Sequence, residues 1–185
     1  MARKEAAFTK EFTDMLTGQF PDGWVYKIPD AGTVGPARPF DVIAVLQDTP
    51  FAFELKFHNS HCAFPFSKVE DHQIQALEAF SSAGGLAWVV IGVRFDLRTI
   101  PEKAAIALTQ ALPAWFEGSK FDAIVFFTVE QWKKMEEVVV NAGRNSVGLL
   151  DLIDLWACFV IDKGRIVGDL DSLFTVWGVY DGEES

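Results

Sequence analysis

Apolar and polar positions along the chain follow two periods, one helical and one extended. Phe8 and Phe12 recur at helical spacing with Met15 and Leu16, which predicts a helix over residues 4–17. Short apolar runs bounded by Gly, Pro, Asp or Ser are typical of strands. Such runs occupy residues 24–28, 40–46, 51–57, 86–93 and 121–127. We therefore expect an α/β fold with a central mixed β-sheet flanked by helices.

Polar residues mark the starts of further helices. Ser67-Lys68-Val69-Glu70 has the form of a capping box and predicts a helix that runs to about residue 82. Thr128 is a suitable N-cap for a helix that runs to Met135. Two more helices are expected over residues 101–112 and 146–155.

The strands expected over residues 40–46 and 51–57 form a hairpin whose two faces differ in chemistry. With a four-residue turn between them, Asp41 lies opposite Lys56 and Ile43 lies opposite Glu54. Side chains alternate faces along a strand, so Asp41, Glu54 and Lys56 share one face, and the Cα atoms of Asp41 and Glu54 are about 7–8 Å apart, which lets the two carboxylates lean together. The other face is wholly apolar and comprises Phe40, Val42, Ala44, Leu46, Phe51, Phe53, Leu55 and Phe57.

Two carboxylates held this close repel each other, and burial of either is costly without a positive partner. A bound Mg²⁺ or Mn²⁺ would offset both costs, because hard cations take oxygen ligands from one or two carboxylates, waters and phosphate. Lys56 could then stabilise negative charge on a phosphate. The alternative is structural: Asp41 and Lys56 form an ordinary cross-strand ion pair, and Glu54 is exposed.

The residues around this hairpin resemble a known family. Asp41 is followed, after twelve intervening residues, by Glu54-Leu55-Lys56, which resembles the D…E-x-K core of the PD-(D/E)xK nucleases, with Phe40 at the degenerate proline position. The runs Ala63-Phe64-Pro65-Phe66 and Asp71-His72-Gln73-Ile74 resemble the S-F-P-L run and the H-Q-I helix of RecU-type bacterial Holliday junction resolvases. The resemblance is good over about residues 3–95. It implies a restriction-endonuclease-like core within a single domain, 1–185, with residues 96–185 as a C-terminal extension.

This resemblance implies a metal-dependent DNA endonuclease that acts on branched DNA, such as Holliday junctions, in recombination or repair. It assigns Asp41 and Glu54 as ligands of Mg²⁺ or Mn²⁺, and Lys56 as the catalytic lysine. Gln73 corresponds to a glutamine that faces the active site from the following helix. The resemblance also implies a homodimer, since two strands of a junction are cut symmetrically.

The family also has an acidic residue on its first helix, which would be a further metal ligand. Glu5 and Glu11 are the candidates, and Glu5 is preferred because Phe8 and Phe12 follow it at +3 and +7 on the buried face. Three basic residues near the site are candidate phosphate contacts: Lys27, Arg38 and Lys68.

One departure from the family concerns the segment before the catalytic aspartate. RecU proteins carry a long stalk insertion there, whereas only residues 30–40, with Arg38 among them, separate Pro29 from Asp41. The stalk is therefore absent or reduced to a short loop. Junction specificity does not follow from the resemblance, and a restriction-like or phage-type nuclease that acts on linear or flap DNA is an alternative.

Charge and cysteine content bear on partners and compartment. The formal net charge is −10, which disfavours non-specific binding to DNA, although the excess of acidic residues is greatest in residues 120–185. A non-catalytic DNA-binding or assembly protein that retains the nuclease fold is therefore a second alternative. Cys62 and Cys158 lie in unlike contexts, and no run is long enough to span a membrane, so we expect a cytoplasmic protein with reduced thiols. His58, His61 and Cys62 lack a fourth ligand for zinc.

Overall fold

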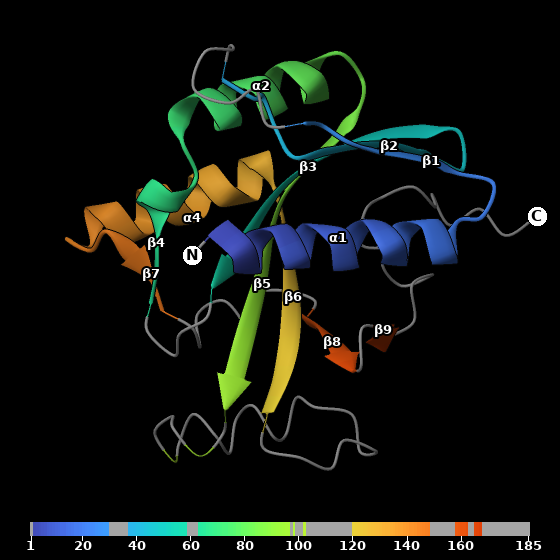
Figure 1. Cartoon of the computed structure of the whole chain (residues 1–185). Helices are drawn as coiled ribbons and strands as arrows, with labels where there is room; N and C mark the ends of the chain where they lie inside the picture. The colour runs from blue at the N-terminus through green and yellow to red at the C-terminus, as the bar shows by residue number, and fades with distance from the viewer. Residues whose placement is uncertain are drawn as a thin grey trace, which may run out of the picture.

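A seven-stranded sheet forms the centre of the computed structural model (Figure 1), which describes residues 2–29, 37–58, 63–96, 98, 102, 120–148, 158–162 and 165–167. The strand order is β1-β2-β3-β5-β6-β8-β9. Among the described strands, only β3 and β5 pair in parallel, and the other neighbours in this sheet are antiparallel. The strands are β1 (Trp24–Lys27), β2 (Val42–Leu46), β3 (Thr49–His58), β5 (Leu86–Asp96), β6 (Lys120–Thr128), β8 (Cys158–Asp162) and β9 (Arg165–Val167).

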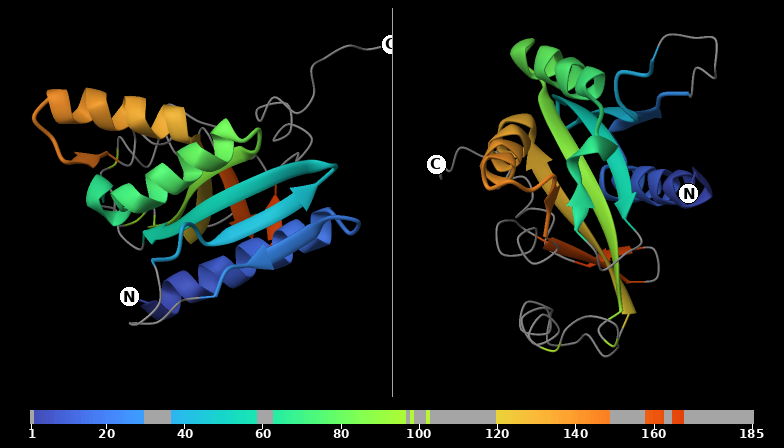
Figure 2. Two further views of the ribbon diagram at one scale, coloured as in Figure 1. Left: turned by 90° about the horizontal axis from the view of Figure 1, so that it is seen from above. Right: turned by 90° about the vertical axis from the view of Figure 1, so that its left-hand side faces the viewer.

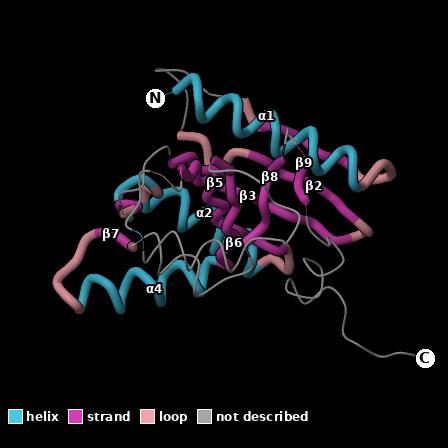
Figure 3. Tube along the Cα trace, turned by 90° about the horizontal axis from the view of Figure 1, so that it is seen from below, coloured by secondary structure: helices cyan, strands magenta, loops and turns pink. Residues whose placement is uncertain are grey.

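Helices cover both faces of this sheet. Helix α1 (Ala2–Gln19) lies on one face, and α2 (Asp71–Ser82) and α4 (Val129–Asn141) lie on the other, as Figures 2 and 3 show. A 3-10 turn, η1 (Phe66–Lys68), precedes α2, and a small second sheet pairs β4 (Phe64–Pro65) with β7 (Ser146–Val147). The expected α/β fold, a central mixed sheet flanked by helices, is thus confirmed. No helix in the described part of the chain is long and apolar enough to cross a membrane.

The α1-side core, between α1 and the sheet, is built from aliphatic and aromatic side chains. Phe12 meets Phe53 edge-on at a ring-centroid distance of 5.1 Å, and Phe8 and Leu16 extend the same contact along the helix. This helical spacing is the one that the sequence predicted. The buried members of the α1-side core are Phe8, Phe12, Leu16, Val42, Ala44, Leu46, Phe51, Phe53, Leu55, Trp88, Val90, Ile124 and Phe126.

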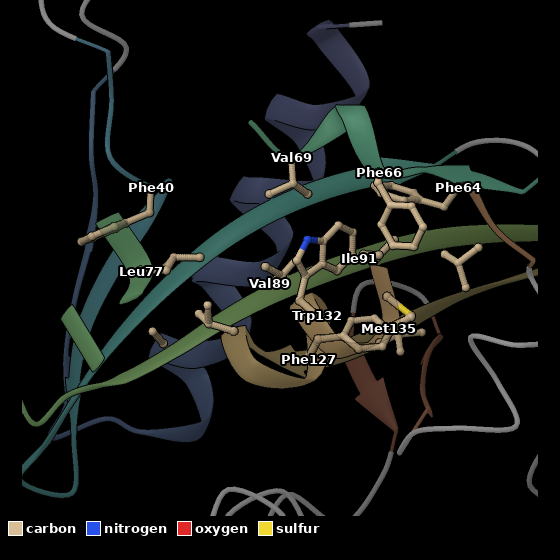
Figure 4. Packing of buried hydrophobic residues seen from close by; sticks show 14 of the residues in the cluster. Phe40, Phe64, Phe66, Val69, Leu77, Val89, Ile91, Phe127, Trp132 and Met135 are labelled. Carbon is tan, nitrogen blue, oxygen red and sulfur yellow. The ribbon is translucent and has the colours of Figure 1, made fainter. Parts of the chain in front are cut away.

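The α2-side core is built around Trp132 (Figure 4). Phe64, Phe66 and Phe127 each meet the Trp132 ring edge-on, at centroid distances of 6.0, 5.4 and 5.9 Å. Edge-to-face contacts of this kind suit the quadrupoles of aromatic rings. This core anchors α2 and α4 to the sheet and so fixes where α2 begins.

The register of the β2–β3 hairpin differs from the prediction. Val42 pairs with Phe53 and Leu46 with Thr49, so the turn has two residues rather than four. Gln47 and Asp48, the two turn residues, have φ angles of 48° and 63°, which a tight hairpin turn of the I′ type requires. Our register was wrong by two positions, but an even error leaves every strand side chain on its predicted face.

Phe40 was placed on the wrong face by the same prediction. Its ring packs edge-on against Phe80 of α2 at 5.7 Å and belongs to the α2-side core. The strict alternation fails here because regular pairing of β2 begins only at Val42.

Three expected helices also differ from the structure. Helix α2 begins at Asp71 with Glu70 as its N-cap, because Phe66–Lys68 forms the 3-10 turn and Ser67 is not the cap. Thr128 caps α4 as expected, although that helix continues to Asn141. Ser146 and Val147, expected in a helix, form β7, and residues 149–155 lie outside the described residues, as does almost all of 101–112.

Candidate active site

Asp41 stands where the regular ladder between β2 and β3 ends. Its N–H donates to the carbonyl of Phe53 (3.0 Å), and its Oδ2 accepts a hydrogen bond from the N–H of Leu55 (2.7 Å). Its own carbonyl accepts from the N–H of Ile28 (2.9 Å). The carboxylate therefore replaces a backbone acceptor of the ladder, which fixes its position against β3.

Arg38 pairs with this carboxylate. Its guanidinium contacts Asp41 Oδ1, and its Nη1 lies 3.5 Å from the carbonyl of Ile28. The Nε2 atom of His72 lies 3.2 Å from the carbonyl of Arg38, which connects this segment to α2. Sequence reasoning assigned Arg38 to phosphate and did not assign His72. The sequence contains a signal for each of these contacts: Arg38 lies three residues before Asp41, and His72 lies directly before Gln73.

Glu54 is the most deeply buried ionisable residue of the site, with no exposed surface. Its Oε1 accepts from Lys56 Nζ at 2.7 Å and from Gln73 Nε2 at 2.6 Å. Its Oε2 is buried without a hydrogen-bond partner. Continuing the hairpin register one position past Val42 and Phe53 brings Asp41 beside Glu54. The structure thus brings Asp41, Glu54, Lys56 and Gln73 together, whereas the structural alternative required an exposed Glu54.

Burial, and after it the negative charge of Asp41, raise the pKa of Glu54 from 4.5 to about 7. Lys56 and Arg38 act in the opposite direction but do not cancel these effects. In the absence of a further cation, the Glu54 carboxyl is therefore partly protonated near neutral pH. The acidic pair, Asp41 and Glu54, has capacity for additional positive charge.

Gln73 connects this pair to the start of α2. Its Oε1 accepts from the N–H of Glu70 at 3.0 Å and completes the capping box, while its Nε2 donates to Glu54. The amide orientation is fixed by these two bonds, because the oxygen faces a donor and the nitrogen faces an acceptor. The helix start thus holds the Glu54 carboxylate in place.

A cavity of about 170 Å³ opens beside Asp41. Its lining combines α1 with the end of the hairpin: Glu5, Ala6, Thr9, Lys27, Arg38, Asp41, Leu55 and Lys56. Glu5 therefore lies on the cavity wall, whereas Glu11 is exposed and is not among the lining residues. Glu54 is fully buried and is not among the lining residues. Within the described ranges, no three acidic, His or Cys side chains form a group that could hold a metal ion.

Lys68 lies apart from the cavity lining. Its Nζ contacts the carbonyl of Phe57 (3.4 Å) and Nδ1 of His58 (3.3 Å), and it lies 5.4 Å from the centre of the Phe64 ring. These contacts give Lys68 a role in joining η1 to the end of β3. His61 and Cys62, which were weighed with His58 as zinc ligands, lie outside the described residues.

The residues present fit a divalent cation of the Mg²⁺ type. The buried, unpaired Oε2 of Glu54 and the adjacent Asp41 carboxylate offer hard oxygen donors. Mg²⁺ in proteins takes only one or two carboxylates and completes its shell with water and phosphate. The acidic pair can accept additional positive charge, and its oxygen donors are of the type that Mg²⁺ prefers. Both properties are consistent with a divalent cation of this kind.

Comparison with known proteins agrees with the resemblance seen in the sequence. A family model described as Recombination protein U matches residues 30–104, a range that includes Asp41, Glu54, Lys56 and Gln73. Among solved structures, the chain is similar to Hjc, a Holliday junction resolvase of Archaeoglobus fulgidus. That match has 18% identity and a TM-score of 0.35, and covers 66% of this chain and 77% of the other. No curated protein matches the chain.

Proposed function

We propose that this protein is a divalent-metal-dependent endonuclease that hydrolyses phosphodiester bonds in structured or branched DNA, such as Holliday junctions. One observation carries the proposal: the fully buried Glu54 carboxylate lies beside Asp41 and Lys56 with one oxygen unpaired. Burying a carboxylate oxygen without a partner costs stability, so the fold alone does not account for it. The similarity to Recombination protein U over residues 30–104 supports the same conclusion.

Each residue of the site has a distinct role in this proposal. Asp41 and Glu54 would hold Mg²⁺ or Mn²⁺, which would act as a Lewis acid towards the scissile phosphate. Lys56 would donate to a non-bridging phosphate oxygen and stabilise the charge that develops there. Gln73 would be a positioning residue that keeps Glu54 in the orientation required for binding.

Arg38 and Lys27 would bind the DNA backbone. Both line the cavity beside Asp41, which makes them better candidates for phosphate contacts than Lys68. Glu5, which lines the same cavity from α1, would add the acidic residue of the first helix to the ligands of the cation, directly or through water. A cytoplasmic homodimer is part of the proposal, since paired incisions in a junction require two sites.

A cleavage assay on a panel of DNAs tests this function. The panel comprises a four-way junction, a flap, a linear duplex and a single strand of equal length, each with Mg²⁺, Mn²⁺ or EDTA. We expect cleavage with either metal, none with EDTA, and a preference for the branched substrates. Cleavage that persists in EDTA would contradict the proposal. DNA binding without cleavage under every condition would favour the non-catalytic alternative.

A further inference from the structure

An exposed pair of aromatic rings lies on β1, at the edge of the sheet. Trp24 and Tyr26 are 53% and 47% exposed, and their rings are parallel within 4° at a centroid distance of 5.7 Å. Val45, the partner of Trp24 on β2, is 40% exposed and extends the apolar surface. A contiguous exposed apolar surface on a folded domain commonly marks a binding site. We call Trp24 and Tyr26 the aromatic platform.

The aromatic platform lies on the sheet face that carries Glu54 and Lys56. Tyr26 pairs with Ile43, and Ile43 pairs with Ala52 of β3. Paired residues point to the same face, and every second residue along a strand does so as well. Counting two and four residues on from Ala52 therefore reaches Glu54 and Lys56 on the platform's face.

The platform also lies at a useful distance from the candidate active site. The N–H of Ile28, just past the end of β1, donates to the carbonyl of Asp41. At about 3.3 Å per residue, Tyr26 is then roughly 7 Å and Trp24 roughly 13 Å along the chain from this point. Those distances correspond to about two to four nucleotides of a DNA strand, for which the axial spacing is about 3.4 Å.

The charges at the two ends of the platform differ. Arg38 and Lys56 line the cavity at the end nearest the acidic pair, and Lys56 lies on the platform's face, whereas Lys27, which follows Tyr26 on β1, points to the other face. Asp22 and Asp48 lie at the other end, where they line a second cavity beside Trp24 and Val45. A phosphate backbone is therefore favoured only at the basic end. A strand held there would place its next bases over the rings and end before the acidic turn.

We infer that Trp24 and Tyr26 stack with unpaired nucleobases of the DNA strand whose phosphate enters the active site. This inference rests on the proposed function and adds to it a class of substrate: DNA in which bases next to the cut are unpaired, as at a branch point or a frayed end. Stacking on an aromatic ring requires no particular base, so the platform selects unpaired structure rather than sequence. The platform would supply part of the selectivity for branched DNA that this chain, with its short segment before Asp41, does not obtain from a stalk.

Fluorescence of 2-aminopurine tests the inference without any dependence on cleavage. The base analogue is placed in a short unpaired stretch of a branched DNA, and binding is titrated in EDTA with the full-length protein. We expect Trp24→Ala and Tyr26→Ala to weaken binding roughly 5- to 100-fold and to remove the quenching that stacking causes. Trp24→Phe should restore much of the quenching, because it retains a ring. Val138→Ser, which removes an exposed apolar side chain on α4, is the matched control and should bind within about twofold of the wild type.

The other outcomes are equally decisive. If the variants bind DNA with unpaired bases as tightly as the wild type does, the platform does not stack with bases. The same follows if the variants lose as much affinity for fully paired duplex as for DNA with unpaired bases. If Trp24→Ala converts a dimer to a monomer in sedimentation experiments, the surface is an interface between copies and the inference is wrong. A wild type that cleaves DNA while the platform variants bind normally would overturn the inference alone. A wild type that neither binds nor cleaves DNA would overturn the proposed function as well.

Discussion

The two faces of β3 show how differently one strand can be used. Towards α1, the strand presents Phe51, Phe53 and Leu55, all buried in the α1-side core. Towards α2, it presents Ala52, which is buried, followed by Glu54 and Lys56. The α1 face stabilises the fold by removing apolar surface from water. The α2 face contains a carboxylate with an unpaired oxygen, which costs stability. The difference teaches that burial on this strand stabilises the fold on one face, while on the other it encloses the side chains that we propose bind the cation.

The largest expected effect is the loss of catalysis on the α2 face. Asp41→Ala and Glu54→Ala should abolish Mg²⁺-dependent cleavage, because each removes one of the two carboxylates proposed to hold the cation. Lys56→Ala should slow cleavage roughly 10²- to 10³-fold while metal affinity, measured by calorimetry, is retained. Glu11→Ala, which alters an exposed acid on α1, is the control. Cleavage by Asp41→Ala at saturating Mg²⁺ would show that the assignment is wrong.

A comparably large effect, on stability alone, is expected from the α1 face. Phe53→Ala removes a buried ring that packs against Phe12 and should lower the free energy of unfolding by about 3–5 kcal/mol. Cleavage per folded molecule should remain, because Phe53 does not contribute a side chain to the cavity. Urea denaturation and assays at low temperature measure the two quantities. A loss of activity larger than the loss of folded protein would show that the two faces are coupled.

A smaller effect follows from the pKa of Glu54, which folding raises from 4.5 to about 7. Between these values the folded protein binds a proton that the unfolded chain releases. The contribution of Glu54 is therefore fully present below pH 4.5 and is lost as the pH rises through 7. In the metal-free protein this loss should reach at most about 3 kcal/mol, since one pKa unit corresponds to about 1.4 kcal/mol.

Glu54→Gln isolates this contribution, because the variant cannot ionise at position 54. The difference in unfolding free energy between wild type and variant, measured from pH 4 to pH 8 in EDTA, should change in favour of the variant as the pH rises. Saturating Mg²⁺ should flatten the wild-type curve. A difference that is constant with pH would show that Glu54 titrates as an ordinary glutamate.

The smallest effect is expected from the connection between α2 and the acidic pair. Gln73→Met keeps the length of the side chain but removes its bonds to Glu54 and to the Glu70 N–H. We expect cleavage to fall roughly 10- to 100-fold, because supporting residues of this kind tune the groups that they orient. Gln75→Met, an exposed glutamine on the same helix, is the matched control. Equal effects of the two variants would exclude a positioning role for Gln73.

Much of this geometry could be predicted from the sequence because it depends on the parity of strand positions. An error of two residues in the hairpin register did not change which side chains share a face, so Glu54 and Lys56 were still predicted beside Asp41. An error of one residue would have put Asp41 on the opposite face from Glu54 and Lys56. The turn was missed because Gln47 and Asp48 are not the usual Asn-Gly pair, and Pro50 suggested a longer loop. The face of Phe40 was predicted wrongly because the regular pairing of β2 with β3 ends before it. There the Asp41 carboxylate, rather than a backbone carbonyl, accepts the hydrogen bond from the Leu55 N–H.

The start of α2 and the strand β7 could not be predicted from local signals. Ser67 and Glu70 have capping-box spacing, but Phe66 is drawn into the α2-side core, and the true capping box uses Glu70 and Gln73. Val147 lies in a strand because it pairs with Phe64, which is distant in sequence. Such a partner leaves no trace in local periodicity. The raised pKa of Glu54 likewise depends on burial from several elements.

The bond from the Leu55 amide to the Asp41 carboxylate has a consequence for hydrogen exchange. Most amides in a central strand are protected by a neighbouring backbone, so their exchange reports how often the sheet opens. The Leu55 proton is held instead by the side chain proposed to bind the cation. Its exchange rate should therefore respond to whatever draws that carboxylate away, while the amides on either side keep the protection of the sheet. A single backbone proton would then report, at equilibrium and without turnover, on the occupancy of the site.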